Sequence, residues 1–412
     1  MAAEPGMHGS AEPRGGSRAP IGLLLAVAFV LALGSSAWMP LLPLYLRGYV
    51  QPASVATIAR HVGLLGGEYT LALFACAAWW GRLSDRVGRR PVLIAGFATY
   101  LVGMLGSAIA TDLVQAYAAR ILSGIGAAAV LPAAQAYLAD LGGGARRNRR
   151  FAMLGGASFA GFVIGPLLGS WLAGPVMGMR PLDMPWMIDL PLLAVAAIGS
   201  AILPFVTLWL VPTARAPAVI RQARTDERES AFMRTSMLLA ALAAFAVGSF
   251  EVGFNLFGRT HLRAGPGAVA ALFVTCSASM LLAQGLLAWE PLRRRFDRRW
   301  MVSAFAASAV SMALAPLMSG ILALAMAVAV VATSIGLIAP ALAYAMLDRD
   351  GTVRGAQLGS LAAAGNLGQA IGSLLAGWLF AIRPQAPFGV AALVLAAGAA
   401  AAHSHWNQRS IN

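Results

Sequence analysis

The amino-acid sequence predicts an all-α membrane protein with 12 transmembrane helices. Hydrophobic residues fill 59% of its 412 positions and charged residues 11%, whereas about a quarter of the residues in a soluble domain are charged. The charged residues gather in short blocks, separated by apolar runs of about 20 residues, the length of a helix that crosses a hydrocarbon core. A water-soluble surface cannot be built from this composition, so we expect the protein to lie in a lipid bilayer.

The first half of the chain predicts six spans. Residues 1–20 are rich in Gly, Ala, Pro and Ser, which favours a disordered tail. The apolar run at 21–46 is too long for the core of a signal peptide and lacks a cleavage site, so we interpret it as a retained first span. Further runs, bounded by charged residues or by Pro and Gly, lie at 62–80, 91–110, 113–139, 151–172 and 188–211. Residues 21–211 are therefore expected to form an N-terminal bundle of six helices.

The second half repeats this layout after a polar segment. Residues 212–235 hold five arginines and three acidic residues and no apolar run, so they are expected to form a cytoplasmic linker. Six more runs follow at 236–257, 268–289, 301–318, 321–347, 356–382 and 387–403. Residues 236–403 are expected to form a C-terminal bundle of six helices, and residues 404–412 a cytoplasmic tail.

The arginines predict the orientation in the membrane. With a cytoplasmic N-terminus, 23 of the 30 basic residues lie on the cytoplasmic side and six on the other side. This asymmetry follows the positive-inside rule and predicts that both termini are cytoplasmic, in a multi-pass protein of the inner or plasma membrane. The net charge of +14 arises in these loops, so we expect no nucleic-acid partner.

No pattern in the sequence indicates an enzyme. Cys76 and Cys276 lie inside apolar runs without a Cys or His at metal-ligand spacing, so neither a disulfide nor a metal site is expected. The sequence contains no nucleotide-binding loop, zinc-binding His pair or nucleophile elbow. We therefore expect no metal, no cofactor and no catalysis.

The loop between the second and third spans carries the most specific motif, GRLSDRVGRRPVL, which starts at Gly81. Its glycines permit a tight turn and close helix approach, and its charged residues can form a clasp on the cytoplasmic surface. The motif resembles the loop signature of the major facilitator superfamily. That resemblance implies the major facilitator fold, in which two six-helix bundles enclose a central cavity and transport a small molecule by alternating access. It implies a conformational latch made of Gly81, Asp85, Arg86, Gly88, Arg89, Arg90 and Asp140.

Within this latch, the resemblance implies that Asp85 faces the start of span eleven and that Arg86 pairs with Asp140. The helix dipole at the start of span eleven would favour an anion such as Asp85. The alternative is a basic loop that only sets the orientation of the protein.

The fifth span resembles the antiporter signature of the drug and proton exchangers in that superfamily, through Gly156, Gly161, Gly165, Pro166 and Gly169. It departs from the signature at Ser170, where Gly is usual. Small residues four apart leave one helix face without side-chain bulk, and the proline permits a bend. Ordinary small-residue packing is the alternative.

Three charged side chains inside spans are candidates for proton coupling. Arg120 lies in span four within a sequence that resembles an Arg and Gly motif of the superfamily, and Glu68 and Glu251 lie in spans two and seven. Charge inside a membrane is costly and typical of a transport pathway or a buried pair. A carboxyl group in a low-dielectric setting can load and release a proton near neutral pH. We expect Glu68 to pair with Arg120, whereas Glu251 has no evident partner; a bracing role for Arg120 and solvated positions for the acids are the alternatives.

Polar side chains in the central spans are candidates to line a substrate cavity; they are Tyr69, Asn255, Gln284, Asn366 and Gln369. Polar groups in an apolar cavity suit an amphiphilic substrate. At helical spacing, ordinary packing is the alternative.

These observations predict a monomeric exporter that exchanges a small amphiphilic molecule for protons. A drug, a toxic metabolite or a siderophore-like product would fit, and multidrug resistance would be one consequence. The alternatives are a proton-coupled uptake symporter and a membrane receptor that uses the same scaffold without transport.

Overall fold

The computed structural model describes residues 19–51, 53–141, 145–177, 190–211, 227–288, 297–350 and 355–405. Within these ranges every regular element is a helix. The N-terminal half contains α1 (Ala19–Trp38), η1 (Met39–Leu41), α2 (Leu42–Leu46), α3 (Val55–Val87), α4 (Arg89–Ile109), α5 (Leu113–Asp140), α6 (Ala145–Met177) and α7 (Leu190–Trp209). The C-terminal half contains α8 (Glu227–Thr260), α9 (Pro266–Ala288), α11 (Arg298–Leu314), η3 (Ala315–Leu317), α12 (Ile321–Asp350), α13 (Gly355–Ile382) and α14 (Ala386–His405).

Twelve stretches of the described chain are long and apolar enough to cross a membrane, as the sequence predicted. Large apolar side chains cover the outside of the molecule, with exposed fractions of 70% or more at Trp171, Leu208, Leu282, Leu322 and Leu393. Such a surface would be unfavourable in water and is suited to lipid. This is a multi-pass membrane protein.

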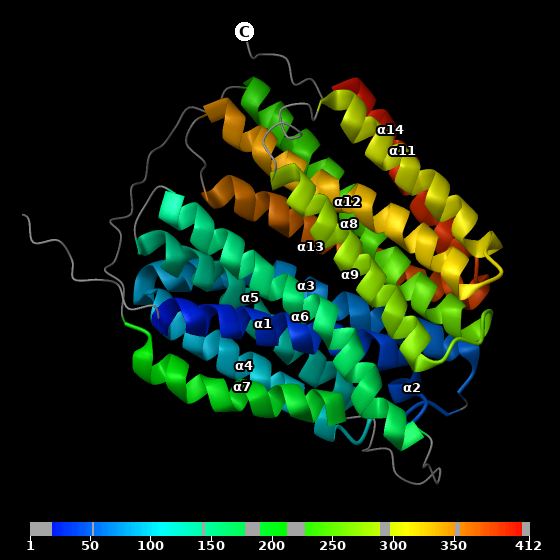
Figure 1. Ribbon diagram of the computed structural model, residues 1–412, viewed down its shortest axis with the longest axis horizontal. Coiled ribbons are helices and arrows are strands. Elements are labelled where there is room, and N and C mark those ends of the chain that lie inside the picture. The colour runs from blue at the N-terminus through cyan, green and yellow to red at the C-terminus, as the bar shows by residue number, and fades with distance from the viewer. Residues whose placement is uncertain are drawn as a thin grey trace, which may run out of the picture.

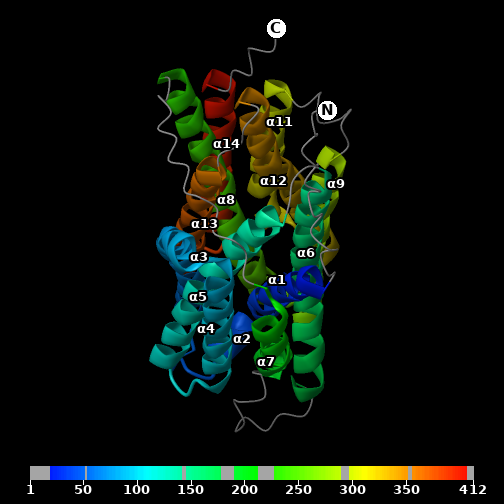
Figure 2. The ribbon, with the colours of Figure 1, turned by 90° about the vertical axis from the view of Figure 1, so that its left-hand side faces the viewer.

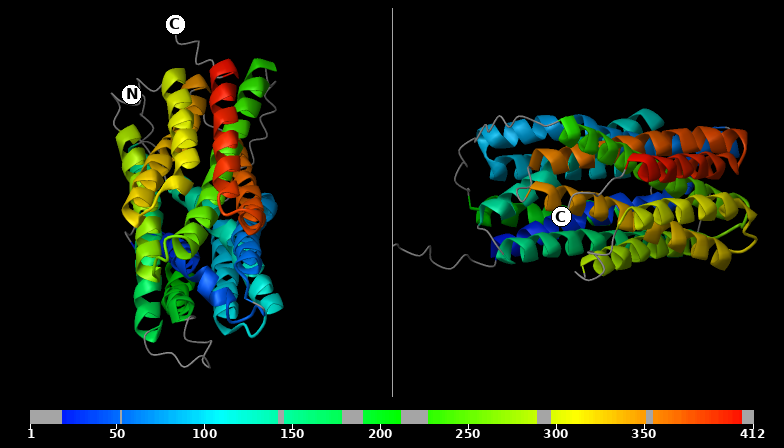
Figure 3. Two further views of the ribbon diagram at one scale, coloured as in Figure 1. Left: turned by 90° about the vertical axis from the view of Figure 1, so that its right-hand side faces the viewer. Right: turned by 90° about the horizontal axis from the view of Figure 1, so that it is seen from above.

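The helices run roughly along one axis and form two six-helix bundles (Figures 1 and 3). In Figure 1 the N-terminal half, in blue to green, lies below the C-terminal half, in green to red. The halves meet along two seams, where α3 packs on α13 and α6 packs on α9, and Figure 2 shows both pairs side by side. The predicted fold class is confirmed.

Several predicted helix boundaries differ from the structure, and the starts of two helices matter here. The second span begins at Val55, seven residues earlier than expected, because Ser54 caps the helix by accepting a hydrogen bond from the amide of Thr57 at 3.0 Å. Glu68 therefore lies 13 residues along its helix, about 20 Å from the helix start, and not six residues along it. The seventh span begins at Glu227, inside the expected linker. Residues 212–226 lie outside the described residues, as do residues 1–18 and 406–412 of the predicted tails. Residues 19–20 and 404–405 of those tails are helical, in α1 and α14.

Glycines set the spacing of helices inside each bundle, and Gly126 on α5 shows this most clearly. A Cβ atom at Gly126 would lie 2.3 Å from the backbone nitrogen of Tyr100 and 2.6 Å from the carbonyl oxygen of Gly96, both on α4. Because both contacts are with backbone atoms, no side-chain rotation relieves them. Helix α5 can lie this close to α4 only because Gly126 carries no side chain.

We expect Gly126→Ala to destabilise the purified protein by about 1–3 kcal/mol through overpacking. The matched control is Gly285→Ala on α9, where an added Cβ meets no atom within 4 Å. Thermal unfolding in detergent checks this expectation. Equal melting temperatures for the two variants would contradict the packing described for α4 and α5.

Candidate functional site

Arg120 is the most deeply buried charged side chain of the candidate site, with 2% of its surface exposed. It lies on α5, seven residues after the helix starts at Leu113. Its guanidinium carbon is 4.7 Å from the ring centre of Trp38 and 4.2 Å from that of Tyr69. Two aromatic faces thus stabilise the charge through cation–π contacts. The Nε and Nη1 atoms are buried without a hydrogen-bond partner.

Glu68 lies on α3 next to Tyr69, whose ring contacts the Arg120 guanidinium. The expected direct pair is absent, because no nitrogen of Arg120 lies within 4.0 Å of a Glu68 oxygen among the described ion pairs. The Oε1 atom of Glu68 is buried and accepts no hydrogen bond. The aromatic ring of Tyr69, rather than the acid, occupies the position against the guanidinium. Among the described ion pairs, Glu68 therefore has no partner.

Glu251 has a partner that the sequence did not reveal. Its Oε2 atom accepts a hydrogen bond of 3.3 Å from Nε2 of Gln369, so the pair links α8 to α13 within the C-terminal half. Gln369 was expected to line a substrate cavity. A neutral amide donor can serve the charged and the protonated carboxyl group alike.

The remaining cavity candidates fall in two kinds of place. Gln284 on α9 and Asn366 on α13 are half-buried. Tyr69 is 8% exposed and Asn255 is 2% exposed. Asn255 lies in the contact between the two halves, where its Nδ2 atom donates to the carbonyl oxygen of Met39 at 2.6 Å. In this conformation Asn255 joins the halves and does not line an open cavity.

Contacts between the halves concentrate toward one side of the molecule. We call it the outer side, because the arginine asymmetry predicts that it faces away from the cytoplasm; α1, α8 and α13 end there, and α3 begins there. Arg259 donates to the carbonyl oxygen of Pro40, beside the Asn255 contact. The Arg60 guanidinium lies 4.8 Å from the ring centre of Trp378 on α13.

Glycines bring α3 and α13 into backbone contact near this outer side. A Cβ atom at Gly63 would lie 2.6 Å from the Ser373 carbonyl oxygen and 2.8 Å from the Cα atom of Gly377. One turn deeper, a Cβ atom at Gly67 would lie 2.9 Å from the carbonyl oxygen of Ala370. The two halves thus close on each other through a seam of small residues.

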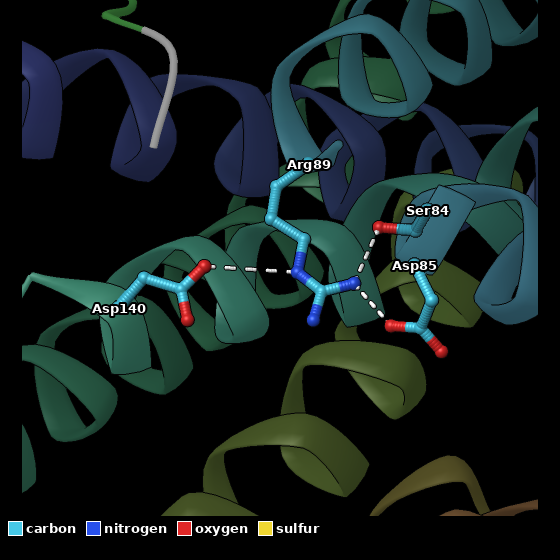
Figure 4. Close-up of polar contacts among 4 residues, drawn as sticks. All are labelled: Ser84, Asp85, Arg89 and Asp140. Atoms are coloured by element: carbon cyan, nitrogen blue, oxygen red, sulfur yellow. Dashed lines mark hydrogen bonds and ion pairs between the residues drawn. The ribbon is translucent and has the colours of Figure 1, made fainter. Parts of the chain in front are cut away.

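On the opposite side, the charged loop motif contacts only the N-terminal half among the described residues (Figure 4). Arg89 donates to Asp85 at 2.5 Å and to Ser84 at 3.2 Å, and its Nε atom lies 3.7 Å from Asp140. The predicted pair of Arg86 and Asp140 is wrong. Arg89 starts α4 and reaches the end of α5, whereas Arg86 is exposed on the last turn of α3.

Gly81 differs from its expected place in the turn, whereas the expectation that Asp85 faces the start of span eleven stays a prediction. Gly88 makes the turn between α3 and α4 with a φ of 102°, which favours glycine, but Gly81 lies inside α3, where an added Cβ meets no atom within 4 Å. Asp85 contacts Arg89 in its own loop, and residues 351–354, just before α13, lie outside the described residues. Arg90 donates to the Thr207 carbonyl oxygen of α7 at 2.5 Å and fixes the loop to the bundle.

Replacing Arg89 is expected to slow transport with little effect on stability. The Arg89→Gln substitution removes the contacts to both Asp85 and Asp140, and exposed pairs of this kind contribute about 0.2–1 kcal/mol each. The matched control is Arg82→Gln, because Arg82 is exposed in the same segment. Initial transport rates and melting temperatures of both variants check the expectation. A rate unchanged by Arg89→Gln would show that the loop is only topogenic.

The small-residue face of α6 packs on α1, inside the N-terminal half. Cβ atoms at Gly161, Gly165 and Gly169 would lie 2.5, 2.7 and 2.2 Å from carbonyl oxygens of α1. Gly156 meets no atom within 4 Å. The seam therefore joins two helices of one bundle, and the contact of α6 with the other half is made elsewhere, where Ser277 of α9 donates to Phe162 at 3.4 Å.

No metal site emerges in the part of the chain that the structure describes, because no three His, Cys, Asp or Glu side chains gather there. The described residues form a buried arginine near a carboxyl group inside the spans, a closed outer seam and a charged loop. Comparison with known proteins places this arrangement in a family.

The family model described as Major Facilitator Superfamily matches residues 24–353. The chain belongs to the major facilitator superfamily. Multidrug resistance protein 2 of Bacillus subtilis (strain 168) is 24% identical over 387 residues, 91% of this chain and 92% of that protein. The class C tetracycline resistance protein of Escherichia coli is 28% identical over 388 residues, 91% of this chain and 93% of that protein.

Solved structures share the fold of this major facilitator protein at low sequence identity. The human organic anion transporter MFSD10 has a TM-score of 0.66 at 20% identity, over 93% of this chain and 99% of that chain. A bacterial homologue of the human lysosomal transporter Spinster has a TM-score of 0.72 at 13% identity, over 95% and 97% of the two chains. The protein is thus a membrane transporter of this superfamily.

The sequence did not indicate which residues join the two halves of the transporter. In the structure they include Gly63, Arg259 and Trp378. The closely spaced glycines of span two were a visible signal for a tight helix contact. Their partner could not be inferred, because a contact between helices more than 300 residues apart leaves no local pattern.

Proposed function

We propose that this transporter exports a small amphiphilic molecule across the cell membrane in exchange for protons. The observation that carries the proposal is the arrangement of Glu68 and Arg120, in which Glu68 has a buried carboxyl oxygen without a partner and the neighbouring Tyr69 ring contacts the buried Arg120 guanidinium. Similarity to a multidrug resistance protein and a tetracycline resistance protein supports the outward direction. Polar side chains among apolar helices support an amphiphilic substrate.

Alternating access would supply the mechanism. Contacts at Asn255, Arg259 and the Gly63 seam hold the outer side closed, so we infer a conformation that receives substrate from the cytoplasm. Outward opening would break these contacts and expose the site to the other side. Proton binding at Glu68 would then favour substrate release, because it changes the net charge beside Arg120. Export follows if substrate and proton occupy the protein in turn.

Everted membrane vesicles with an imposed proton gradient test this proposal. The probes are tetracycline, ethidium and a hydroxamate siderophore, chosen to represent the substrate classes under consideration. We expect accumulation of at least one probe that requires both the protein and the gradient. Accumulation without a gradient, or transport of none of the three probes, would contradict proton-coupled export.

The same vesicles separate the alternatives. A symporter would accumulate substrate when the gradient is reversed, and a receptor would bind a probe without moving it. Export by antiport is favoured over both because the intramembrane charges are present and the fifth span keeps its small-residue seam.

A further inference from the structure

A histidine and a tyrosine on the outer part of the N-terminal bundle contact each other without any role in the site described so far. The Nδ1 atom of His61 on α3 lies 2.7 Å from the hydroxyl oxygen of Tyr117 on α5, within hydrogen-bond distance. The centres of the two rings are 6.0 Å apart. Both side chains are half-buried. His61 lies six residues after the start of α3, and Tyr117 four residues after the start of α5, so both are near the outer side.

These two residues share helix faces with Glu68 and Arg120. His61 and Glu68 are seven residues apart, and Tyr117 and Arg120 are three residues apart, so each pair lies on one face of its helix. The rise of a helix places Glu68 about 10 Å deeper than His61. A line of ionisable groups therefore runs from the outer end of α3 and α5 toward the unpartnered Oε1 atom of Glu68.

The charged groups near this end of α3 make no described contact with His61. Arg60 faces Trp378 on α13, and Asp112 caps α5 by accepting a hydrogen bond of 2.8 Å from the amide of Gln115. On α8, Arg259 donates to Pro40, and Arg47 follows α2 at the exposed surface. Tyr117 is the only polar partner of His61 among the described residues.

We propose that His61 and Tyr117 form the outer segment of the proton path to Glu68. The proposal rests on the proposed function, in which Glu68 binds the exchanged proton. A proton from outside water adds to one nitrogen of the imidazole, and the other nitrogen releases its proton to the tyrosine hydroxyl. The hydroxyl passes its own proton, through a bridging water, to the Glu68 carboxylate, which ends neutral. Each relay group ends uncharged, because imidazole and hydroxyl groups both donate and accept. His61 ends as its other tautomer, so a ring flip of the imidazole resets it before the next proton.

Time-resolved infrared spectroscopy on proteoliposomes tests this path without any substrate. The carbonyl stretch of the protonated Glu68 is identified as the band that the Glu68→Gln substitution removes. Light-triggered release of protons on the outer side then starts its protonation. We expect this band to rise at least about tenfold more slowly in His61→Gln and in Tyr117→Phe than in the unmodified protein, as for loss of a positioned proton-transfer group. Its final amplitude should be unchanged.

The matched control is His261→Gln, because His261 is another histidine near the outer side; it is exposed and stacks on Phe257. Equal rates in His61→Gln, Tyr117→Phe and the control would overturn the path. The unchanged final amplitude excludes misfolding, since a disrupted site would alter the band itself. If coupled export in vesicles requires Glu68 while the band rises at one rate in all variants, the proposed function stands and only the path fails.

Discussion

Glu68→Gln is expected to abolish proton-coupled export while leaving substrate exchange intact. Glutamine keeps the shape of the side chain but cannot bind and release a proton. The protein should still alternate between its two conformations, so exchange of labelled for unlabelled substrate across the membrane continues. Accumulation against a gradient should fall to the level of vesicles without the transporter. Parallel assays of exchange and of gradient-driven accumulation in the same vesicle preparation measure both effects.

The matched control for this prediction is Glu251→Gln. Glu251 is the other carboxyl group inside the spans that the sequence singled out, and its Oε2 atom accepts a hydrogen bond from Gln369. A glutamine at position 251 can accept the same hydrogen bond, so we expect coupling to survive. If Glu251→Gln loses proton coupling while Glu68→Gln keeps it, the proton site lies in the C-terminal half.

Gly63→Ala is expected to shift the transporter toward an outward-open conformation. The added Cβ would lie 2.6 Å from the Ser373 carbonyl oxygen only while the outer seam is closed. The clash is with backbone, so it must be relieved by separating α3 from α13. Overpacking of this kind costs about 1–3 kcal/mol, which changes the ratio of two conformations roughly 5- to 150-fold. The cytoplasm-facing state should therefore lose population, and the export rate should fall.

Pulsed electron paramagnetic resonance measures this shift. Spin labels at Val55 and Ile382 report the outer opening, because these residues start α3 and end α13 and are 51% and 73% exposed. In Gly63→Ala the distance distribution should move to longer values. Gly66→Ala is the matched control, since its Cβ would lie at an ordinary 3.7 Å from the Ser373 side chain. Identical distributions for the two variants would contradict a moving seam at Gly63.

The fold could be predicted from the sequence because a membrane imposes its thickness on every span. Apolar length alone located all 12 helices, and the GRLSDRVGRRPVL motif identified the family. Boundaries were less accurate where a helix extends beyond the apolar run. The start of α3 shows this, since polar residues such as Arg60 and His61 continue the helix past the predicted limit.

The candidate site was predicted in its residue types but not in its contacts. Arg120 and Glu68 stand out because charge is rare inside apolar runs, but the sequence gives no sign that Trp38 and Tyr69 enclose the guanidinium. In the loop, the sequence allows any of three neighbouring arginines to pair with Asp140. In the structure, Arg89, which starts α4 directly after the turn at Gly88, has its Nε atom 3.7 Å from Asp140, and residue type alone does not distinguish Arg89 from Arg86.

Proton exchange at Glu68 is tested most directly by the direction of proton flow that a substrate gradient alone drives. Purified transporter in liposomes receives a gradient of a transported probe and no pH gradient, and a pH-sensitive dye reports proton movement. We predict that protons move in the direction opposite to the probe. In the Glu68→Gln variant we predict no proton movement. Proton movement in the same direction as the probe, or no proton movement in the unmodified protein, would contradict exchange at Glu68.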